Sequence, residues 1–230
     1  MVEILPGVHQ IDGVNANSYA IVEDDGSLTI IDTGMSKDVK KILHYVETKM
    51  SKKPSDVKTI VLTHSHIDHV RGAYEMRKAS GARLAIHEQD ADYLSGKKKM
   101  PYPKGAIGFM FRIFSPLFKF TPVEPDQRLK ENDSVGGGRL SVLHTPGHTP
   151  GSISLYDKER KLILVGDTIR YMKGRLQGPP KQFTLDMNQA IQSVQKISDL
   201  DFNTMLSGHG EPFKSSDAPQ KVKELSAFIK

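Results

Sequence analysis

The sequence lacks cysteine and tryptophan, and none of its apolar runs approaches the roughly 20 residues that a membrane-spanning helix needs. The absence of cysteine excludes disulfides, thiol nucleophiles and cysteine-based zinc sites. Residues 1–10 show no basic stretch followed by an apolar segment, so no secretory signal is visible. These absences predict a cytoplasmic globular protein that acts without a membrane.

A strong charge of one sign is also missing. The chain has 32 Lys and Arg against 27 Asp and Glu, a net charge of +5. This mild excess is common on solvated surfaces, and it is the only feature that suggests a non-catalytic nucleic-acid-binding module. Apolar residues make up 37% of the 230 residues, which is enough for a hydrophobic core.

Hydrophobic patterning predicts alternating strands and helices. Strands are expected at 18–22, 28–32, 58–62, 83–87, 140–144, 153–156, 162–165 and 204–206. Helices are expected from Ser36, as N-cap, to about Met50, from Val70 to Ala79 with Gly81 at the end, from 186 to about 200, and from about 218 onward. No fixed-period repeat or linker-like segment is visible, so we expect one α/β domain over residues 1–230.

The periodicity fails between residues 96 and 125, a segment rich in proline, glycine and aromatic residues. Its phenylalanines suit two interpretations: a lid that lines a substrate pocket, or a helix that packs inward as core. The candidate pocket residues are Phe109, Phe114 and Phe118.

The most informative segment is Thr63–His69, which reads T-H-S-H-I-D-H and directly follows a predicted buried strand. Imidazole and carboxylate are the donors that Zn²⁺, Fe²⁺ and Mn²⁺ accept when thiolate is absent. On an extended turn, His64 and His66 point to the same side and reach one ion. Asp68 and His69 lie about one turn further on and reach a second.

Three further segments have polar side chains at turns or strand ends. His148 lies between two Pro-Gly turns, which fix the backbone and expose the imidazole. Asp167 comes just after an apolar strand, and His209 lies in a Gly-His-Gly turn near the C-terminus.

Together these segments resemble the metallo-β-lactamase-fold hydrolase superfamily. The H-x-H-x-D-H, T-P-G-H-T-P-G-S, G-D-T and G-H-G elements occur in the family's order between Asp32 and Gly210. The resemblance implies an αββα four-layer sandwich, in which two mixed β-sheets are flanked by helices. It implies a first metal on His64, His66 and His148, and a second on Asp68, His69 and His209. Asp167 would bridge the two, and Asp32 would orient the histidine loop.

The chemistry implied is hydrolysis of a small ester, lactone or thioester, with a small-molecule acyl substrate as the partner. Two cations, zinc or alternatively iron or manganese, lower the pKa of a shared water so that hydroxide is available at neutral pH. Asp68 is the candidate general base. Whether the protein forms a homodimer is left open.

True β-lactamases of the commonest class use a cysteine at the second metal, and this chain has none. With Asp167 in the bridging position, the chain resembles the glyoxalase II and lactonase branch. Tyr171 lies one position later than the tyrosine that assists the carbonyl in acyl-homoserine lactonases, and it is a second catalytic candidate. The alternative function is a mononuclear iron persulfide dioxygenase that uses His64, His148 and Asp167.

Overall fold

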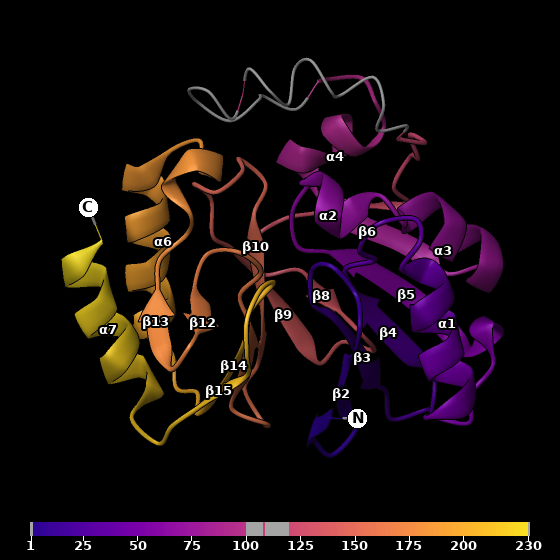
Figure 1. Cartoon of the computed structure of the whole chain (residues 1–230), viewed down its shortest axis with the longest axis horizontal. Coiled ribbons are helices and arrows are strands. Elements are labelled where there is room, and N and C mark those ends of the chain that lie inside the picture. The colour runs from indigo at the N-terminus through magenta and orange to yellow at the C-terminus, as the bar shows by residue number, and fades with distance from the viewer. Residues whose placement is uncertain (1, 100–107, 109–119, 230) are drawn as a thin grey trace.

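The computed structural model describes residues 2–99, 108 and 120–229 (Figure 1). The first sheet has seven strands in chain order: β1 (Val2–Leu5), β2 (Val8–Ile11), β3 (Ser18–Val22), β4 (Leu28–Ile31), β5 (Val57–Leu62), β6 (Arg83–His87) and β7 (Gln127–Leu129). Strands β1 to β4 pair antiparallel, whereas β4 to β7 pair parallel.

The second sheet has six strands, in the order β15 (Phe213–Lys214), β14 (Thr204–Leu206), β11 (Leu162–Leu164), β10 (Ile153–Asp157), β9 (Leu140–His144) and β8 (Ser134–Val135). Among its described strands, β11 and β14 form the one parallel pair. A separate hairpin is formed by β12 (Arg170–Met172) and β13 (Arg175–Gln177). Both large sheets are therefore mixed, as the sequence predicts.

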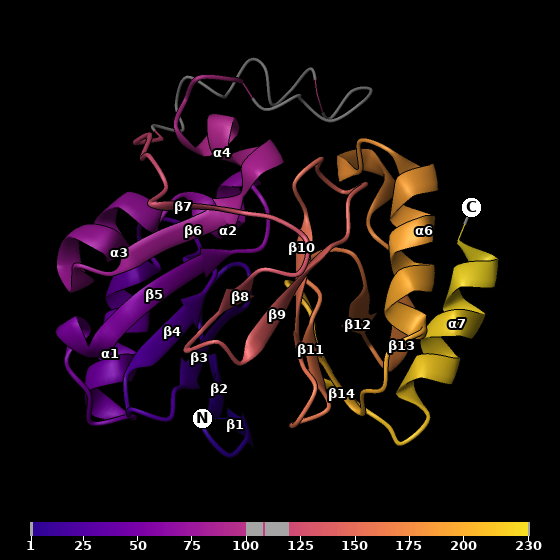
Figure 2. The same cartoon turned by 180° about the vertical axis from the view of Figure 1, so that it is seen from behind.

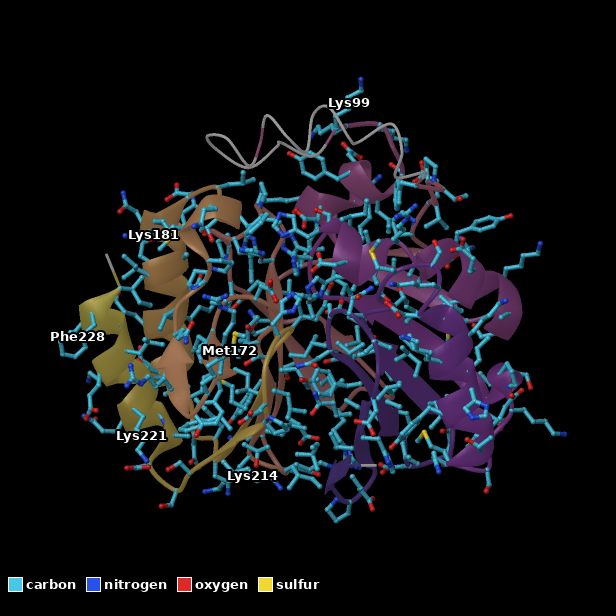
Figure 3. All side chains as sticks on the ribbon, viewed as in Figure 1. Lys99, Met172, Lys181, Lys214, Lys221 and Phe228 are labelled. Carbon is cyan, nitrogen blue, oxygen red and sulfur yellow. The ribbon has the colours of Figure 1, made fainter. Side chains whose placement is uncertain are left out.

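Helices cover the two outer faces (Figures 1 and 2). The first sheet carries α1 (Val39–Thr48) and α3 (Ala73–Ser80), with the short α2 (Ile67–Val70) and α4 (Glu88–Leu94) nearby. The second sheet carries α6 (Met187–Ser198) and α7 (Ala218–Phe228). Phe228 projects from α7 at the edge of the molecule and is 80% exposed (Figure 3). The predicted αββα sandwich is confirmed.

Three apolar clusters separate the four layers, and β5 shows how one strand serves two of them. Ile60 and Leu62 belong to the cluster under α1 and α3, whereas Val61 belongs to the cluster between the sheets. Successive side chains of a strand point to opposite faces, so a strand buried on both faces reads as a continuous apolar run. The third cluster lies beneath α6 and α7 and contains Phe202.

Two of the predicted helix starts are wrong. Helix α1 begins at Val39 after Asp38, and the Ser36 hydroxyl instead donates to the Arg71 carbonyl. The helix expected from Val70 is divided into α2 and α3 at Gly72, where a Cβ would lie 2.5 Å from the Thr33 carbonyl oxygen. This close packing needs glycine, which interrupts the helix.

The predicted end of α3 is confirmed, because Gly81 has a φ of +73° and caps the helix in the left-handed region. The sequence did not predict α4, the β12–β13 hairpin or the short strands β1, β2, β7, β8 and β15. Phe109, Phe114 and Phe118 lie outside the described residues, so the choice between lid and core helix stays open. Phe120, just beyond them, packs against the cluster under α1 and α3.

Among the described residues, no helix combines the length and the apolar character that crossing a bilayer requires. The cytoplasmic location and the single-domain organisation stay predictions.

The buried position of β5 generates a stability prediction. Replacing Ile60, which is fully buried, with alanine leaves a cavity under α1 and should lower the free energy of unfolding by about 2–5 kcal/mol. Urea unfolding of the metal-free protein measures this loss. Lys58→Ala in the same strand is the control: Lys58 is exposed, and the change should stay within about 0.5 kcal/mol. Equal losses in both variants would contradict the layer assignment.

Candidate metal centre

The candidate site lies where the carboxyl ends of two parallel strand pairs meet. Strands β4 and β5 run parallel, so Asp32 after β4 and the histidine loop after β5 emerge at one edge. Strands β11 and β14 do the same for Asp167 and for the turn at 207–210. Ligand sites in α/β folds form at such edges because the loops that follow parallel strands converge there.

Asp32 holds the histidine loop in place through hydrogen bonds to Thr63 and His69. It has a φ of +59°, in the left-handed region that few residues other than glycine, asparagine and aspartate adopt, and its carboxylate is buried. Its Oδ1 accepts a hydrogen bond from the Thr63 backbone N–H at 2.8 Å. Its Oδ2 lies 2.8 Å from both the Thr63 hydroxyl and His69 Nδ1. The position that the sequence assigns to an orienting carboxylate therefore contacts the histidine loop directly.

This network fixes the tautomers of two histidines. The Thr63 hydroxyl has one proton, which it donates to Asp32, so it accepts from His64 Nδ1 at 3.0 Å. His69 Nδ1 likewise donates to Asp32. In both imidazoles, Nε2 is therefore the nitrogen that keeps a lone pair in the neutral ring. Histidine ligands in metalloproteins are oriented in this way.

His148 is oriented by a similar relay through Thr184, in the segment before α6. Its Nδ1 lies 3.2 Å from the Thr184 hydroxyl, which donates its own proton to the Pro180 carbonyl at 2.9 Å. The Thr184 oxygen therefore accepts from His148, and His148 Nε2 keeps a lone pair. This nitrogen lies 2.8 Å from His66 Nδ1.

The segment before α6 also holds the backbone of the His148 loop. The Asp186 N–H donates to the Gly147 carbonyl at 2.9 Å, and the Leu185 N–H donates to the His148 carbonyl at 3.3 Å. Gly147 has a φ of +127°, and a Cβ there would lie 2.3 Å from the Ala190 backbone nitrogen. The Pro-Gly turn predicted to fix this loop thus packs directly against α6.

Asp167 and His209 approach each other through a glycine contact. Gly208 packs so closely that a Cβ would lie 2.2 Å from Asp167 Oδ1 and 2.7 Å from the His69 Cε1 atom. The Gly208 N–H donates to the Gly166 carbonyl at 2.7 Å, which joins the two turns. Only a residue without a side chain lets His209 reach this position.

Asn17 and Tyr19 were not identified as site residues from the sequence, yet they hold the His209 turn. The Asn17 side-chain amide donates to the carbonyls of Ser207 and Gly210, each at 2.9 Å. The Tyr19 hydroxyl donates to the Ser207 carbonyl at 2.6 Å. These partners lie 188 to 193 residues away along the chain, so no local sequence pattern indicates this role.

The structure brings the seven predicted metal-binding side chains together. Their donor atoms form three overlapping groups, each within 4.8 Å: His64, His66 and His148; His64, His69 and Asp167; Asp68, His69 and His209. Asp167 lies between the outer two groups: its Oδ2 is 3.5 Å from His148 Nε2 and 3.6 Å from His209 Nε2.

Several of these donors are buried without a hydrogen-bond partner. Among the described residues, His64 Nε2, His69 Nε2 and Asp167 Oδ1 are such atoms, and all three belong to one group of donors. A buried polar atom without a partner costs free energy, and metal binding at this cluster would satisfy these atoms. Nitrogen and carboxylate donors suit zinc, iron or manganese, so the residues fit a divalent metal.

The electrostatics differ between the two ends of the cluster. Burial and the neighbouring imidazoles hold the pKa values of His64 and His148 well below the usual range, and burial lowers the pKa of His66 to about 4. These three rings are neutral at pH 7 and therefore ready to bind a metal.

The pKa of His69 is raised instead of lowered. Burial opposes its charge, but Asp32, Asp167 and Asp68 outweigh burial and raise the pKa of His69 to about 10. Burial would also raise the pKa of Asp68, but His69, His209 and His66 outweigh it and lower that pKa well below the usual range. Burial raises the pKa of Asp167. His69 is therefore the ring that must lose a proton before it can bind a metal.

The Tyr171 ring packs against Phe213. Its centroid is 5.0 Å from that of Phe213, and it packs against the apolar cluster beneath α6 and α7. The Tyr171 backbone carbonyl accepts from the Glu211 N–H at 2.8 Å, next to the His209 turn. The structure thus places the Tyr171 backbone near the site, and the catalytic role of its hydroxyl stays a prediction.

Comparison with known proteins identifies the family of this chain. A family model described as the metallo-beta-lactamase superfamily matches residues 11–209. A probable metallo-hydrolase of Bacillus subtilis is 29% identical over 243 residues, covering 97% of this chain and 91% of the relative. The family resemblance predicted from the sequence is confirmed.

Two further matches extend the comparison. A hydroxyacylglutathione hydrolase of Cereibacter sphaeroides is 30% identical over 200 residues, covering 84% of this chain and 63% of the relative. The crystal structure of a metallo-beta-lactamase family protein from Thermus thermophilus superposes with a TM-score of 0.74. At 23% identity it covers 97% of this chain and 79% of its own, so this likeness concerns the fold.

Asp32 generates a prediction about metal affinity. In Asp32→Asn the left-handed backbone conformation stays accessible, but the side-chain NH2 group must face at least one of the three groups from which Asp32 accepts a hydrogen bond. We expect metal affinity to fall about 10–100-fold, the usual effect of losing an orienting partner of a ligand. Competition with a chromogenic chelator measures it. An unchanged affinity would contradict the orienting role.

The raised pKa of His69 generates a prediction about pH. Below pH 10 the metal-free protein keeps a proton on His69, and a metal-binding imidazole must be neutral. Metal uptake at pH 7 should therefore release about one proton from this ring, and affinity should rise with pH up to about 10. Calorimetric titration in buffers of different ionisation enthalpy counts the protons. Uptake without proton release would contradict this assignment.

Proposed function

Because this chain belongs to the metallo-beta-lactamase superfamily, it is a metal-dependent hydrolase, and we propose that it uses two divalent ions to hydrolyse a small ester, lactone or thioester. The observation that carries the proposal is the group of buried, unpartnered donors on His64, His69 and Asp167 within a cluster of seven. That number of donors exceeds the four that a single tetrahedral zinc ion takes.

The proposed division of the donors follows the groups in space. His64, His66 and His148 would hold one ion, Asp68, His69 and His209 the other, and Asp167 would lie between them. We propose zinc, because nitrogen-rich donor sets suit it, although iron and manganese accept the same ligands.

When bound, two such ions would supply a nucleophile at neutral pH and would stabilise the negative charge that develops on the substrate oxygen. The chain contributes the groups around them. The Asp68 side chain is 38% exposed, so it is open to solvent on one side while its Oδ2 lies 3.1 Å from His209 Nε2. Because its pKa is low, Asp68 is ionised at pH 7 and can orient a water molecule as a proton acceptor.

A thioester is the substrate that the comparisons support best within the proposed class. The relative named hydroxyacylglutathione hydrolase is 30% identical to this chain over 200 residues. Thioesters, lactones and small esters share a carbonyl that is attacked by a water-derived nucleophile and a leaving group that departs as an anion. One site can therefore serve all three, with the acyl group as the partner to be identified.

The alternative, a mononuclear iron persulfide dioxygenase, would use only His64, His148 and Asp167. It would leave Asp68, His69 and His209 as a second group of donors without a metal role. Metal content separates the two functions.

Metal analysis and a substrate panel test the proposed function. Reconstituted protein should contain about two equivalents of zinc, and chelation should abolish activity. The panel should span glutathione thioesters, lactones of graded chain length and aryl esters. Below about half an equivalent of metal, or with no hydrolysis in any class, the proposal fails. One iron per chain with oxygen consumption on glutathione persulfide would favour the alternative.

A further inference from the structure

Asp90 is a fully buried carboxylate on α4 that the predicted site does not include. It accepts four hydrogen bonds between its two oxygens. Its Oδ2 accepts from the Ser65 backbone N–H at 2.8 Å, from the Ser65 hydroxyl at 2.7 Å and from the Thr149 hydroxyl at 2.7 Å. Its Oδ1 accepts from the Gly151 backbone N–H at 2.7 Å.

The donors come from two loops that are far apart in the sequence. Ser65 stands between His64 and His66, and Thr149 and Gly151 follow His148. One carboxylate therefore joins the loop after β5 to the loop between β9 and β10. At this junction His66 Nδ1 and His148 Nε2 lie 2.8 Å apart.

The backbone of Gly151 also packs closely against Asp90. A Cβ on Gly151 would lie 2.6 Å from the Asp90 backbone nitrogen and 2.7 Å from the Asp90 Cβ. The glycine of the second Pro-Gly turn, Gly151, therefore lets the loop after His148 pack against the start of α4. The Thr149 hydroxyl and N–H also contact the Ser152 hydroxyl, each at 2.9 Å, which closes the turn.

We propose that Asp90 is a positioning residue that fixes the His148 loop against the His64–His66 loop and so sets the spacing of the three-histidine group. This inference rests on the proposed function, because it assigns the group a metal. Asp90 acts through its hydrogen bonds to Ser65, Thr149 and Gly151.

Asp38 provides a matched control. It too is fully buried, and it accepts hydrogen bonds from the Asn15 N–H and side-chain amide, the Met35 N–H and the Lys41 ammonium. It thus joins two chain segments with four donors, but neither segment contains a predicted ligand. A purely structural role for Asp90 predicts that the two residues behave alike.

The test compares Asp90→Asn with Asp38→Asn. Each Asp90 oxygen accepts a hydrogen bond from one backbone N–H, that of Ser65 or that of Gly151. In Asp90→Asn the side-chain NH2 group replaces one oxygen and must therefore face one of these N–H groups. Both variants should lower the melting temperature of the metal-free protein. Only Asp90→Asn should also lower zinc affinity, by about 10–100-fold for one of the equivalents bound, as measured by chelator competition.

Hydrogen exchange of the metal-free protein gives a readout that needs no metal. The Ser65 and Gly151 amides should exchange faster in Asp90→Asn and at the wild-type rate in Asp38→Asn. If Asp90→Asn does not fold, Thr149→Val and Thr149→Ser replace it. The valine variant should lower zinc affinity and the serine variant, which keeps the hydroxyl, should restore it.

The outcomes separate this inference from the proposed function. If the wild-type protein takes up no zinc, both fail. If wild type binds zinc and Asp90→Asn binds it equally well, or if Asp38→Asn loses as much affinity, only the positioning role is overturned. The same conclusion follows if Thr149→Val and Thr149→Ser bind zinc alike.

Discussion

The burial of the Asp32 carboxylate at the end of β4 is the interaction on which the rest of the site depends. A buried carboxylate is costly unless donors surround it, and here the donors are the Thr63 N–H, the Thr63 hydroxyl and His69 Nδ1. Satisfying Asp32 therefore fixes the direction of both His64, through Thr63, and His69. The left-handed backbone at Asp32 is the conformation that turns the carboxylate toward these donors.

The remaining donors are held by the second sheet, so the site is complete only when the two sheets pack. Asp167 and the His209 turn follow β11 and β14, and the His148 loop lies between β9 and β10. Apolar contacts between the sheets, such as those of Val61 and Leu155, set the distance between the two halves of the site. The polar contacts at the edge then fix the orientation of each ring. Burial supplies the free energy, and the hydrogen bonds supply the geometry.

The sequence was most informative where local chemistry decides the structure. The H-x-H-x-D-H segment predicted a turn after a buried strand, and Gly81 predicted the end of α3, because spacing and a left-handed cap are local properties. The N-cap predicted at Ser36 is wrong, because a serine near the start of a helix can equally donate to another loop. Here its hydroxyl donates to the Arg71 carbonyl. Asp90 and Asn17 were missed for the same reason. Their partners lie 25 to 193 residues away, and no local pattern indicates such a distance.

The charges of the site explain why metal and proton compete for it. Asp32, Asp68 and Asp167 place three carboxylates around His69, and their combined field raises its pKa to about 10 although burial opposes the charge. In the metal-free protein the proton on His69 therefore partly neutralises the negative charge of the three carboxylates around it. A divalent ion offsets that charge more fully and lets His69 bind as a neutral ring. If the site held the two ions proposed, their charge would exceed that of the three carboxylates, and the excess would favour the anion that forms when a carbonyl is attacked.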